Sequence, residues 1–403
     1  MDIVKFGELY SIPSGNGLSR PSAVRGDGYR MIGMGELFTK DIISDMEMDR
    51  VQMSEREKKT FLVEADDLLF ARQSLVAAGA GKCSIVKQLS EPTTYESHLI
   101  RVRLNKHKCN PWYYYYLFKL PDNPIKAIVN QCAQAGIRGN ELVRIKVPLP
   151  ERKLQDRIVS VLSAYDNLIE VNNRRIKVLE QMAENLYKEW FVRFRFPGYE
   201  NAEFENGIPK GWEYCTVESL SEILQRGISP EYDDAGELTV ISQKCIRQNI
   251  MDIREARRQT KRFKPELNLV DGDTVICSTG TGTLGRVGQI FGDFPDTTFD
   301  SHVTLVRPKP TIGKHFLYWT LKEMQPWFMN MGIGSTNQQE LYRGTIKNAK
   351  VLNADNRIVT LFEEIIDPIH NRIISLLRNQ DNLIKQRDLL LPRLMSGKLE
   401  IAL

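Results

Sequence analysis

Two stretches of the chain, Val63-Glu-Ala-Asp66-Asp-Leu-Leu-Phe-Ala71 and Val270-Asp-Gly-Asp273-Thr-Val-Ile-Cys-Ser278, follow one pattern about 200 residues apart. Further pairs keep a similar offset: Glu96-Ser97-His98 with Asp300-Ser301-His302, Glu141-Leu142 with Glu340-Leu341, and Arg157-Ile158-Val159 with Arg357-Ile358-Val359. This repeat is far longer than a solenoid unit of about 20–50 residues. It therefore predicts a duplicated domain with a duplicated connector, which suits a two-part target such as duplex DNA with two half-sites.

The composition is that of an ordinary globular chain. The 403 residues are 42% hydrophobic and carry a formal net charge of only +4, so any basic surface must be local. The six cysteines form no C-x-x-C pair, which argues against a zinc site or a disulfide scaffold. The first residues lack the pattern of a signal peptide, and no apolar run is long enough to span a membrane. We expect a soluble cytoplasmic protein.

The order of patterns along the chain predicts alternating globular domains and helices. Strands are expected at 61–72 and 97–104, and two short helices within 110–130, broken by Pro121 and Pro124. The predicted boundaries are 1–150 for the first domain, 151–196 for the first helix, 197–212 for a linker, 213–350 for the second domain, and 351–403 for the second helix with a short tail from 392.

Both helices carry the spacing of three and four residues that is typical of a coiled coil. The predicted seam comprises Leu162, Tyr165, Ile169, Asn172, Ile176, Leu179, Ala183, Leu186 and Trp190 in the first helix, and Phe362, Ile366, Ile369, Ile373, Leu376, Gln380 and Leu383 in the second. Each seam holds a polar residue, Asn172 or Gln380, which can fix the register. We expect antiparallel pairing, with each helix about 45 Å long, which exceeds one DNA turn of about 34–36 Å.

The glycine pattern Gly280-x-Gly282-x-x-Gly285 matches a dinucleotide-binding fingerprint, which must open a helix. Residues 286–291 instead alternate like a strand, so the sequence predicts a glycine-rich hairpin turn. The chain also lacks a Walker sequence, an H-E-x-x-H motif and the Asn-Pro-Pro-aromatic tetrapeptide of an amino-methyltransferase. These absences favour a protein that reads a target without performing chemistry on it.

Aromatic and histidine residues leave a choice between core packing and a functional role. The run Tyr113–Tyr116 could stack on bases, but we expect one buried helix face. The aromatic run over 190–196 could join a partner interface, and packing within the chain is favoured. Ser97-His98 and Ser301-His302 cannot pair as nucleophile and base, because neighbours on a strand point to opposite faces, so a structural role is expected.

Local basic and glycine-rich segments are candidates for nucleic-acid contacts. Residues 243–264 concentrate lysine and arginine, which could bind phosphates or form a merely solvated face. Loops at 14–20, 138–140, 226–229 and 335–339 combine glycine with polar side chains, and Asn and Gln can pair with adenine through two hydrogen bonds. Recurrence of such loops in both halves strengthens this interpretation.

Several stretches resemble the specificity subunit of a type I restriction–modification enzyme. They are Leu186-Tyr-Lys-Glu-Trp-Phe-Val-Arg-Phe194, Gly207-Ile-Pro-x-Gly211-Trp212, Pro148-Leu-Pro150-x(4)-Gln155-x-x-Ile158 and Arg387-Asp-Leu-Leu-Leu-Pro-Arg-Leu-Met-Ser-Gly-Lys-Leu399. The resemblance covers essentially the whole chain. The second boundary, over 351–358, departs from the pattern because it lacks the proline and glutamine.

The resemblance implies an α+β chain with two target-recognition domains, each reading half of a split DNA site, spaced by an antiparallel pair of helices. It also implies two methyltransferase subunits that carry S-adenosylmethionine, and a translocase–nuclease subunit for cleavage. The chain itself would hold no cofactor, metal or catalytic residue.

Carrying the family's roles onto the loops of this chain gives a set of expected DNA contacts. In the first domain they are Ser14, Asn16, Ser19, Arg20, Arg72, Gln73, Lys82, Gln134, Arg138 and Asn140. In the second they are Arg226, Ser229, Lys244, Arg247, Arg257, Arg258, Lys261, Arg262, Thr279, Thr281, Arg286, Thr336, Asn337 and Gln338. The rival interpretations are a self-contained methyltransferase that uses the glycines of 280–285, and a two-headed scaffold for proteins.

Overall fold

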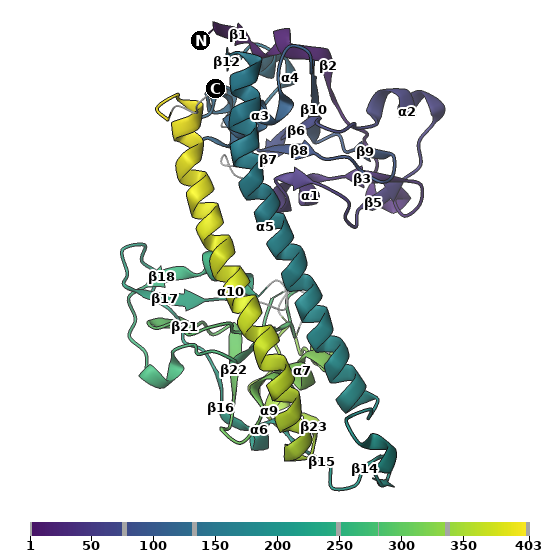
Figure 1. The fold of residues 1–403 in the computed structure, drawn as a ribbon, viewed down its shortest axis with the longest axis vertical. Helices are drawn as coiled ribbons and strands as arrows, with labels where there is room; N and C mark the ends of the chain where they lie inside the picture. Colours follow the sequence, from purple (N-terminus) through teal and green to yellow (C-terminus); the bar gives the residue numbers. More distant parts are fainter. Residues whose placement is uncertain are drawn as a thin grey trace. The chain divides into compact units, whose positions relative to one another are not determined.

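The computed structural model describes residues 2–74, 79–130, 135–246, 251–280, 282–334 and 339–399. The chain divides into two compact units, Met1–Ile169 with Asn382–Leu403, and Glu170–Asp381. The helices α5 (Arg152–Tyr187) and α10 (Asn356–Met395) each contribute to both units (Figure 1). Within the described ranges, no helix is both long and apolar enough to cross a membrane.

The first unit is a mixed α+β domain. Its strands are β1 (Asp2–Lys5), β2 (Tyr10–Asn16), β3 (Tyr29–Ile32), β4 (Ile42–Ile43), β5 (Asp49–Val51), β6 (Leu68–Ala71), β7 (Gln73–Ser74), β8 (Cys83–Val86), β9 (Thr93–Tyr95), β10 (Leu99–Leu104), β11 (Ala135–Gly136) and β12 (Lys146–Leu149). Its helices besides α5 and α10 are η1 (Phe6–Leu9), η2 (Ser22–Val24), α1 (Met34–Thr39), α2 (Glu55–Phe61), α3 (Pro111–Lys119), η4 (Pro124–Ile128) and α4 (Gly139–Leu142). The main sheet has the order β2-β10-β6-β8-β4, beside the smaller sheets β5-β3-β9, β1-β12 and β7-β11.

The second unit is also a mixed α+β domain. Its strands are β13 (Phe204–Glu205), β14 (Ile208–Pro209), β15 (Glu213–Thr216), β16 (Ser221–Arg226), β17 (Leu238–Ile241), β18 (Arg257–Gln259), β19 (Thr274–Cys277), β20 (Val287–Gln289), β21 (Thr297–Phe299), β22 (Val303–Pro308) and β23 (Lys350–Asn353). Its further helices are η5 (Lys188–Val192), η6 (Tyr199–Asn201), α6 (Val217–Leu220), η7 (Gln243–Cys245), η8 (Ile253–Glu255), η9 (Pro265–Leu267), α7 (Lys314–Glu323), α8 (Gln325–Asn330) and α9 (Arg343–Asn348).

The two units repeat one topology, which confirms the predicted duplication. The order β16-β22-β19-β20 matches β2-β10-β6-β8, and β18-β17-β21 matches β5-β3-β9. In both small sheets the central strand pairs antiparallel on one side and parallel on the other. The pair β15-β23 likewise matches β1-β12. The chain thus builds the same scaffold twice.

Around Asp66 and Asp67, the structural alignment of the two units differs by one residue from the alignment of their sequences. Arg103 forms hydrogen bonds of 2.7 Å with both carboxylate oxygens of Asp67, and Arg307 does the same with Asp273. Asp273 therefore corresponds to Asp67 and not to Asp66. The predicted pairing was wrong because consecutive aspartates look alike in sequence, while a bond to a distant strand distinguishes them.

The predicted match of Glu141-Leu142 with Glu340-Leu341 is also wrong. The amide of Ile137 donates to the carbonyl of Arg72 at 2.9 Å, and the amide of Leu341 donates to Ser278 at 2.8 Å. Since Arg72 and Ser278 each follow the matching strand, Leu341 is the counterpart of Ile137. The similarity of the two Glu-Leu dipeptides is a coincidence of sequence.

The first unit has an aromatic core that contains the tyrosine run. Tyr113–Tyr116 are all buried, which confirms core packing. The single buried helix face that was expected is wrong, because four consecutive residues point to all sides of a helix. The hydroxyl of Tyr114 donates to the carbonyl of Pro148 at 3.0 Å, and that of Tyr116 donates to Asp166 on α5 at 2.5 Å. Burial raises the pKa of each of these tyrosines. The bond from Tyr116 therefore links α3 to α5.

The aromatic run after α5 packs within the second unit. Trp190, Phe191 and Phe196 are buried, and the ring of Phe191 lies 4.8 Å from that of Phe316 in α7. The ring of Trp212, at the end of the linker, lies 5.2 Å from that of Phe196 at an angle of 31°. The prediction that these residues pack against their own chain is confirmed.

The long helices pair in antiparallel fashion. Asp166 of α5 accepts from Arg387 of α10 at 2.6 Å in the first unit, and Tyr187 lies 6.2 Å from Phe362 in the second. Of the predicted seam residues, Leu162, Asn172, Ile176, Ala183, Trp190, Phe362, Ile366, Ile373 and Leu376 are buried. Tyr165, Ile169, Leu179, Leu186, Ile369, Gln380 and Leu383 are half-buried.

Two details of α10 go beyond or correct the sequence prediction. Asn172 donates across the helix pair to Asn379 at 3.0 Å, a residue outside the predicted seam. The helix also continues through 392, where a tail was expected, and ends at Met395. Leu394 and Met395 join the core of the first unit, and this burial favours helix over a free tail.

The glycine-rich segment after β19 forms a hairpin, as the alternation of residues 286–291 indicated. Gly280 and Gly285 have positive φ values of 103° and 75°, which favour glycine. The chain then continues as the strand β20 and not as a helix. A dinucleotide fingerprint therefore finds no support in this fold.

Candidate nucleic-acid interface

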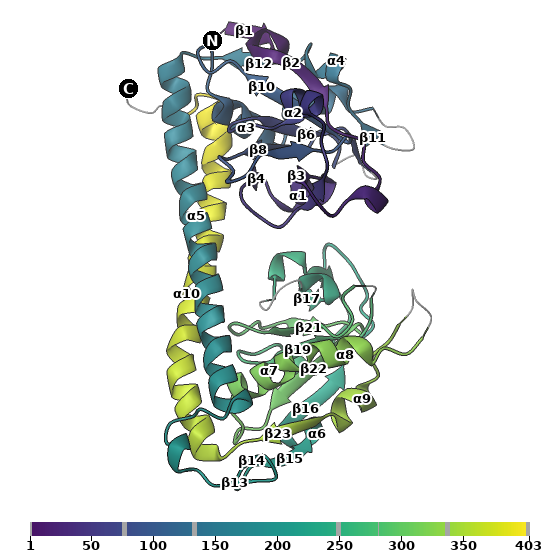
Figure 2. The same cartoon turned by 90° about the vertical axis from the view of Figure 1, so that its right-hand side faces the viewer.

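Loops that are far apart in the first half of the sequence meet at one place in the first unit. The amide of Leu18, in the loop after β2, donates to the carbonyl of Tyr95 at 2.8 Å. The amide of Arg72, just after β6, donates to His98 at 2.8 Å, and that of Ile137 donates to Arg72 at 2.9 Å. The strand β11, next to Ile137, lies on the side of this domain opposite α5 (Figure 2). These bonds define a loop surface that we call the first reading surface.

The second unit repeats this set of bonds. The amide of Ile228 donates to the carbonyl of Phe299 at 3.0 Å, and that of Ser278 donates to His302 at 2.8 Å. The amide of Leu341 donates in turn to Ser278 at 2.8 Å. The same three segments, joined in the same way, form the second reading surface.

One glycine in each reading surface has no room for a side chain. A Cβ atom at Gly17 would lie 2.0 Å from the carbonyl oxygen of Tyr95, and one at Gly227 would lie 2.1 Å from that of Phe299. Neither glycine has a positive φ, so close approach of two backbones is what requires glycine here. The sequence placed both residues in predicted loops but gave no indication of this contact.

The predicted contact residues of the first domain divide into exposed and paired side chains. Asn16, Ser19, Arg138 and Asn140 are exposed, and Ser14, Arg20, Arg72, Gln73 and Lys82 are half-buried. Arg20 pairs with Glu57 at 2.6 Å, and Lys82 donates to the carbonyl of Phe38 at 2.7 Å. The exposed residues are therefore the better candidates for DNA contacts.

In the second domain the basic segment and the glycine loop lie together. Lys261 donates to the carbonyl of Ser229 at 2.9 Å, which joins the segment after β18 to the loop that follows β16. The guanidinium of Arg257 lies 3.7 Å from the ring centre of Tyr232, and Arg226 pairs with Glu340. Lys244, Ser229, Arg257, Arg258 and Arg262 are exposed, whereas Arg226, Lys261, Thr279 and Arg286 are half-buried.

Some predicted contacts lie outside the described residues. They are Gln134 in the first domain, and Arg247, Thr281, Thr336, Asn337 and Gln338 in the second.

His98 and His302 lie in the reading surfaces, although neither is among the predicted contacts. His98 and His302 were expected to have a structural role, but both side chains are exposed. Nδ1 of His98 lies 3.2 Å from the side-chain oxygen of Gln73, and Nδ1 of His302 lies 2.6 Å from the hydroxyl of Thr279. The signal that could have identified them is the repeated acidic-Ser-His sequence just before a strand.

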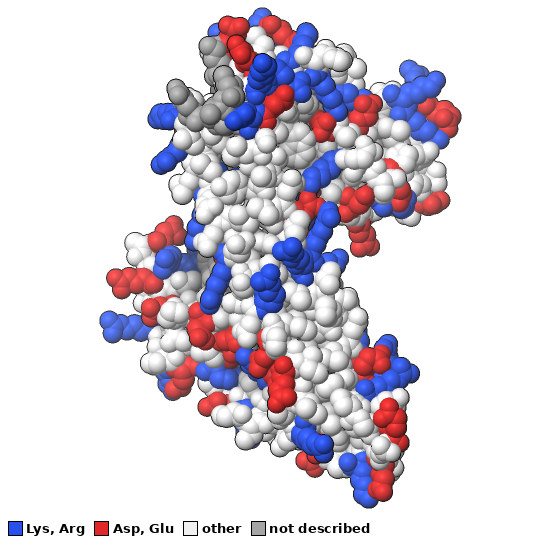
Figure 3. Space-filling view, viewed as in Figure 1, with Lys and Arg blue, Asp and Glu red and all other residues white. Residues whose placement is uncertain are grey.

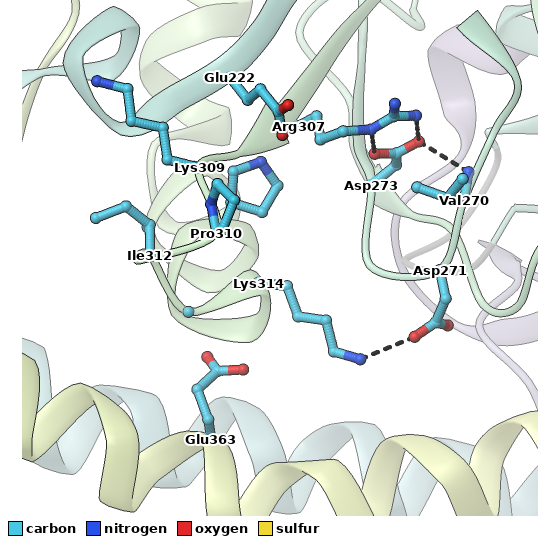
Figure 4. Close-up of a pocket in the computed structure, with 12 residues that line it drawn as sticks. Glu222, Val270, Asp271, Asp273, Arg307, Lys309, Pro310, Ile312, Lys314 and Glu363 are labelled. Carbon is cyan, nitrogen blue, oxygen red and sulfur yellow. Dashed lines mark hydrogen bonds and ion pairs between the residues drawn. The ribbon is translucent and has the colours of Figure 1, made fainter. Parts of the chain in front are cut away.

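A pocket of about 380 Å³ lies beside α10 in the second unit (Figure 4). Lys314 pairs there with Asp271 at 2.8 Å, and Glu363 of α10 accepts from the amides of His315 and Phe316 at 3.0 and 2.8 Å. Glu363 thus caps the start of α7. Burial raises the pKa of Glu363 to about 7, and burial lowers the pKa of His315 to about 4.

Among the described residues, His315, Glu363 and Asp367 could offer ligand atoms to a metal, since these atoms lie within 4.8 Å of one another. The ammonium of Lys314 is 3.5 Å from Asp367, however, and the positive end of α7 faces Glu363. Lys314 and the start of α7 therefore already supply positive charge to the carboxylates of Glu363 and Asp367. The contacts of this cluster join α7 to α10.

The long helices also expose apolar side chains. Val171, Val178 and Met182 of α5 are 40%, 58% and 52% exposed within the second unit, at spacings of seven and four residues. Large uncharged areas cover the face of α5 and α10 that Figure 3 shows. This spacing describes a second apolar stripe, separate from the seam that α10 covers, and such a stripe is typical of a helix with a further partner.

Comparison with known proteins gives consistent matches over both halves of the chain. A family model described as the type I restriction modification DNA specificity domain matches residues 3–181 and 209–379. The type I restriction enzyme MjaIX specificity subunit of Methanocaldococcus jannaschii is 25% identical over 302 residues, which cover 72% of this chain and 69% of that relative. The HindI specificity subunit of Haemophilus influenzae is 22% identical over 329 residues, covering 63% of this chain and 69% of that relative.

A solved structure shows the same fold. The crystal structure of a type I restriction–modification S subunit from M. genitalium aligns with a TM-score of 0.56. It is 13% identical in sequence, and the alignment covers 100% of this chain and 96% of the other. The likeness therefore extends through both units and the long helices.

Proposed function

The chain belongs to the type I restriction–modification DNA specificity family, and from this premise we propose that it selects a bipartite sequence in duplex DNA, with each domain reading one half-site. In this proposal the chain is non-catalytic, and methylation and cleavage belong to partner subunits.

The observation that carries the proposal is the duplicated reading surface. In each domain, equivalent backbone bonds join three segments. These are the loop after β2 or β16, the residue that follows β6 or β19, and the turn with the sequence Glu/Asp-Ser-His. Backbone bonds hold the loops in place, while exposed side chains such as Asn16, Arg138 and Arg262 differ between the domains. A constant scaffold with variable polar side chains is what reading two different short sequences requires.

Partner subunits complete the proposed activity. Two methyltransferase subunits would bind the helix pair, and the apolar stripe of Val171, Val178 and Met182 supports this placement. These subunits would hold S-adenosylmethionine, and translocase–nuclease subunits would join them for cleavage in the cytoplasm, where host DNA lies. The chain's own contribution is the choice of the DNA sequence.

Selection from a random pool of duplexes tests the proposal. The chain, assembled with its methyltransferase subunits, should enrich two short conserved blocks separated by a spacer of fixed length. Binding should also weaken as salt rises, because contacts to phosphates release counterions. Enrichment of no sequence would contradict the proposal, and an affinity that does not change with salt would favour a protein-binding scaffold.

A further inference from the structure

The turn before the last long strand of each domain holds a histidine in a fixed backbone position. The carbonyl of His98 accepts from the amide of Arg72 at 2.8 Å, and the carbonyl of His302 accepts from the amide of Ser278 at 2.8 Å. Within each turn, the amide of Leu99 donates to Glu96 at 3.0 Å, as that of Val303 does to Asp300. In both domains, one bond to the carbonyl of the histidine and one bond across the turn therefore fix the backbone around it.

The imidazole rings are also anchored, at the same atom. Nδ1 of His98 faces the side chain of Gln73 at 3.2 Å, and Nδ1 of His302 faces Thr279 at 2.6 Å. Within the described ranges, no residue forms a hydrogen bond with Nε2 of either ring. Both side chains are exposed, so Nε2 is the ring atom that remains for an outside partner.

We infer that His98 and His302 are specificity-determining residues, and that each reads a base edge in one half-site through Nε2. This inference rests on the proposed function. An Nε2 atom can donate to N7 or O6 of guanine, or accept from the amino group of adenine or cytosine, according to the tautomer that the anchor selects.

Anchoring favours base reading over phosphate binding. A phosphate contact tolerates a mobile side chain, whereas discrimination between bases needs a donor or acceptor in a fixed place. The anchors also differ: the amide oxygen of Gln73 selects the tautomer with a proton on Nδ1, while the hydroxyl of Thr279 serves either tautomer. Equivalent histidines can therefore read different bases in the two half-sites.

Variants of each histidine test the inference in the complete complex with the methyltransferase subunits. The recognised motif is first mapped for the wild type, and a set of duplexes is then made with each base pair of that motif substituted in turn. His98→Ala and His302→Ala are compared with His107→Ala, an exposed histidine of the first unit that lies outside the reading surface. The measured quantity is the ratio of affinities for the original and each substituted duplex.

For His98→Ala and for His302→Ala, this ratio of affinities should fall about tenfold or more at one or two base pairs of a single block. The two variants should affect different blocks. His107→Ala should match the wild type. Unchanged ratios at every base pair, or a uniform loss of affinity with a reduced dependence on salt, would overturn the inference. A wild-type complex that shows no motif would instead contradict the proposed function.

Discussion

Replacing Gly17 with alanine should open the first reading surface without disturbing the rest of the first domain. The added Cβ would lie 2.0 Å from the carbonyl oxygen of Tyr95 and 2.6 Å from that of Glu96. An ordinary non-bonded contact needs about 3.5 Å, so the two backbones must separate by about 1 Å or more. Both neighbours are backbone atoms, which cannot turn aside as a flexible side chain would.

The structure gives the size of the effect. Separation would remove the bond from Leu18 to Tyr95 at 2.8 Å and the bond from Ser97 to Leu18 at 2.9 Å. Each bond contributes about 0.5–1.5 kcal/mol, and overpacking adds about 1–3 kcal/mol. Local opening of the loop should therefore become easier by about 2–6 kcal/mol, which corresponds to roughly 30- to 25,000-fold faster amide exchange.

Hydrogen exchange measured by mass spectrometry over residues 14–20 is the assay. Gly35→Ala is the matched control, because its Cβ would have no atom within 4 Å, and it lies in the short helix α1 of the same domain. The control should exchange as the wild type does, or more slowly. If Gly17→Ala left the exchange of this loop within twofold of the wild type, the backbone contact described above could not be what holds the reading surface together.

Other parts of the structure give three further predictions. Because burial raises the pKa of Glu363 to about 7 from its ordinary value of 4.5, the folded chain keeps this proton at pH values where the unfolded chain has lost it, so the stability that this site contributes falls as pH rises from about 4.5 to 7. Urea unfolding at pH 5 and pH 8 should show the stability of Glu363→Gln rising by up to about 3 kcal/mol relative to the wild type, and a difference that does not vary with pH would refute this. Arg387→Met should cost about 3–5 kcal/mol in thermal or urea unfolding because it removes the cation that pairs with the buried carboxylate of Asp166, which keeps the Tyr116 hydroxyl, whereas Asp166→Leu with Arg387→Met should recover at least half, and an equal cost for both would contradict the pairing. Val178→Glu with Met182→Glu should weaken binding of the methyltransferase subunits by about tenfold or more in a titration, with unfolding unchanged because both side chains are more than half exposed; undiminished binding would place the partners elsewhere.

The duplicated architecture could be predicted because its signals are local and periodic. The helix seams follow a spacing of three and four residues, and residues such as Ile176 and Ile373 are buried at the predicted positions. Alternation after Gly285 likewise distinguished a strand from a cofactor-binding helix. These patterns arise from the geometry of each element and need no knowledge of distant contacts.

The errors concern features that only distant contacts decide. Asp66 and Asp67 are equivalent as letters, and the bond from Arg103 alone selects Asp67 as the residue that repeats in the second half. The spacing marked Asn172 as a polar seam residue, but only the geometry of the helix pair shows that its partner is Asn379, which lies outside the predicted seam. A shift of one residue is small in sequence but decides which side chain meets which.

The candidate site could be predicted as a set of loops but not as a surface. The bonds that join the loop of Leu18 to the turn of His98 link positions about 80 residues apart, so their proximity follows from the sheet order. His98 and His302 were set aside because their neighbouring serines cannot act with them, which excludes catalysis but says nothing about recognition. Their exposure and their anchored Nδ1 atoms became evident only in the folded domain.

Mapping of methylated adenines across the host genome, with and without this gene, tests the central claim most directly. We expect methylation to disappear at one split motif, two short blocks around a spacer of fixed length, when the gene is removed, and to return when it is restored. A methylation pattern that is identical with and without the gene, in cells where the chain and its methyltransferase subunits are produced, would contradict the assignment of this chain as the subunit that chooses the DNA sequence.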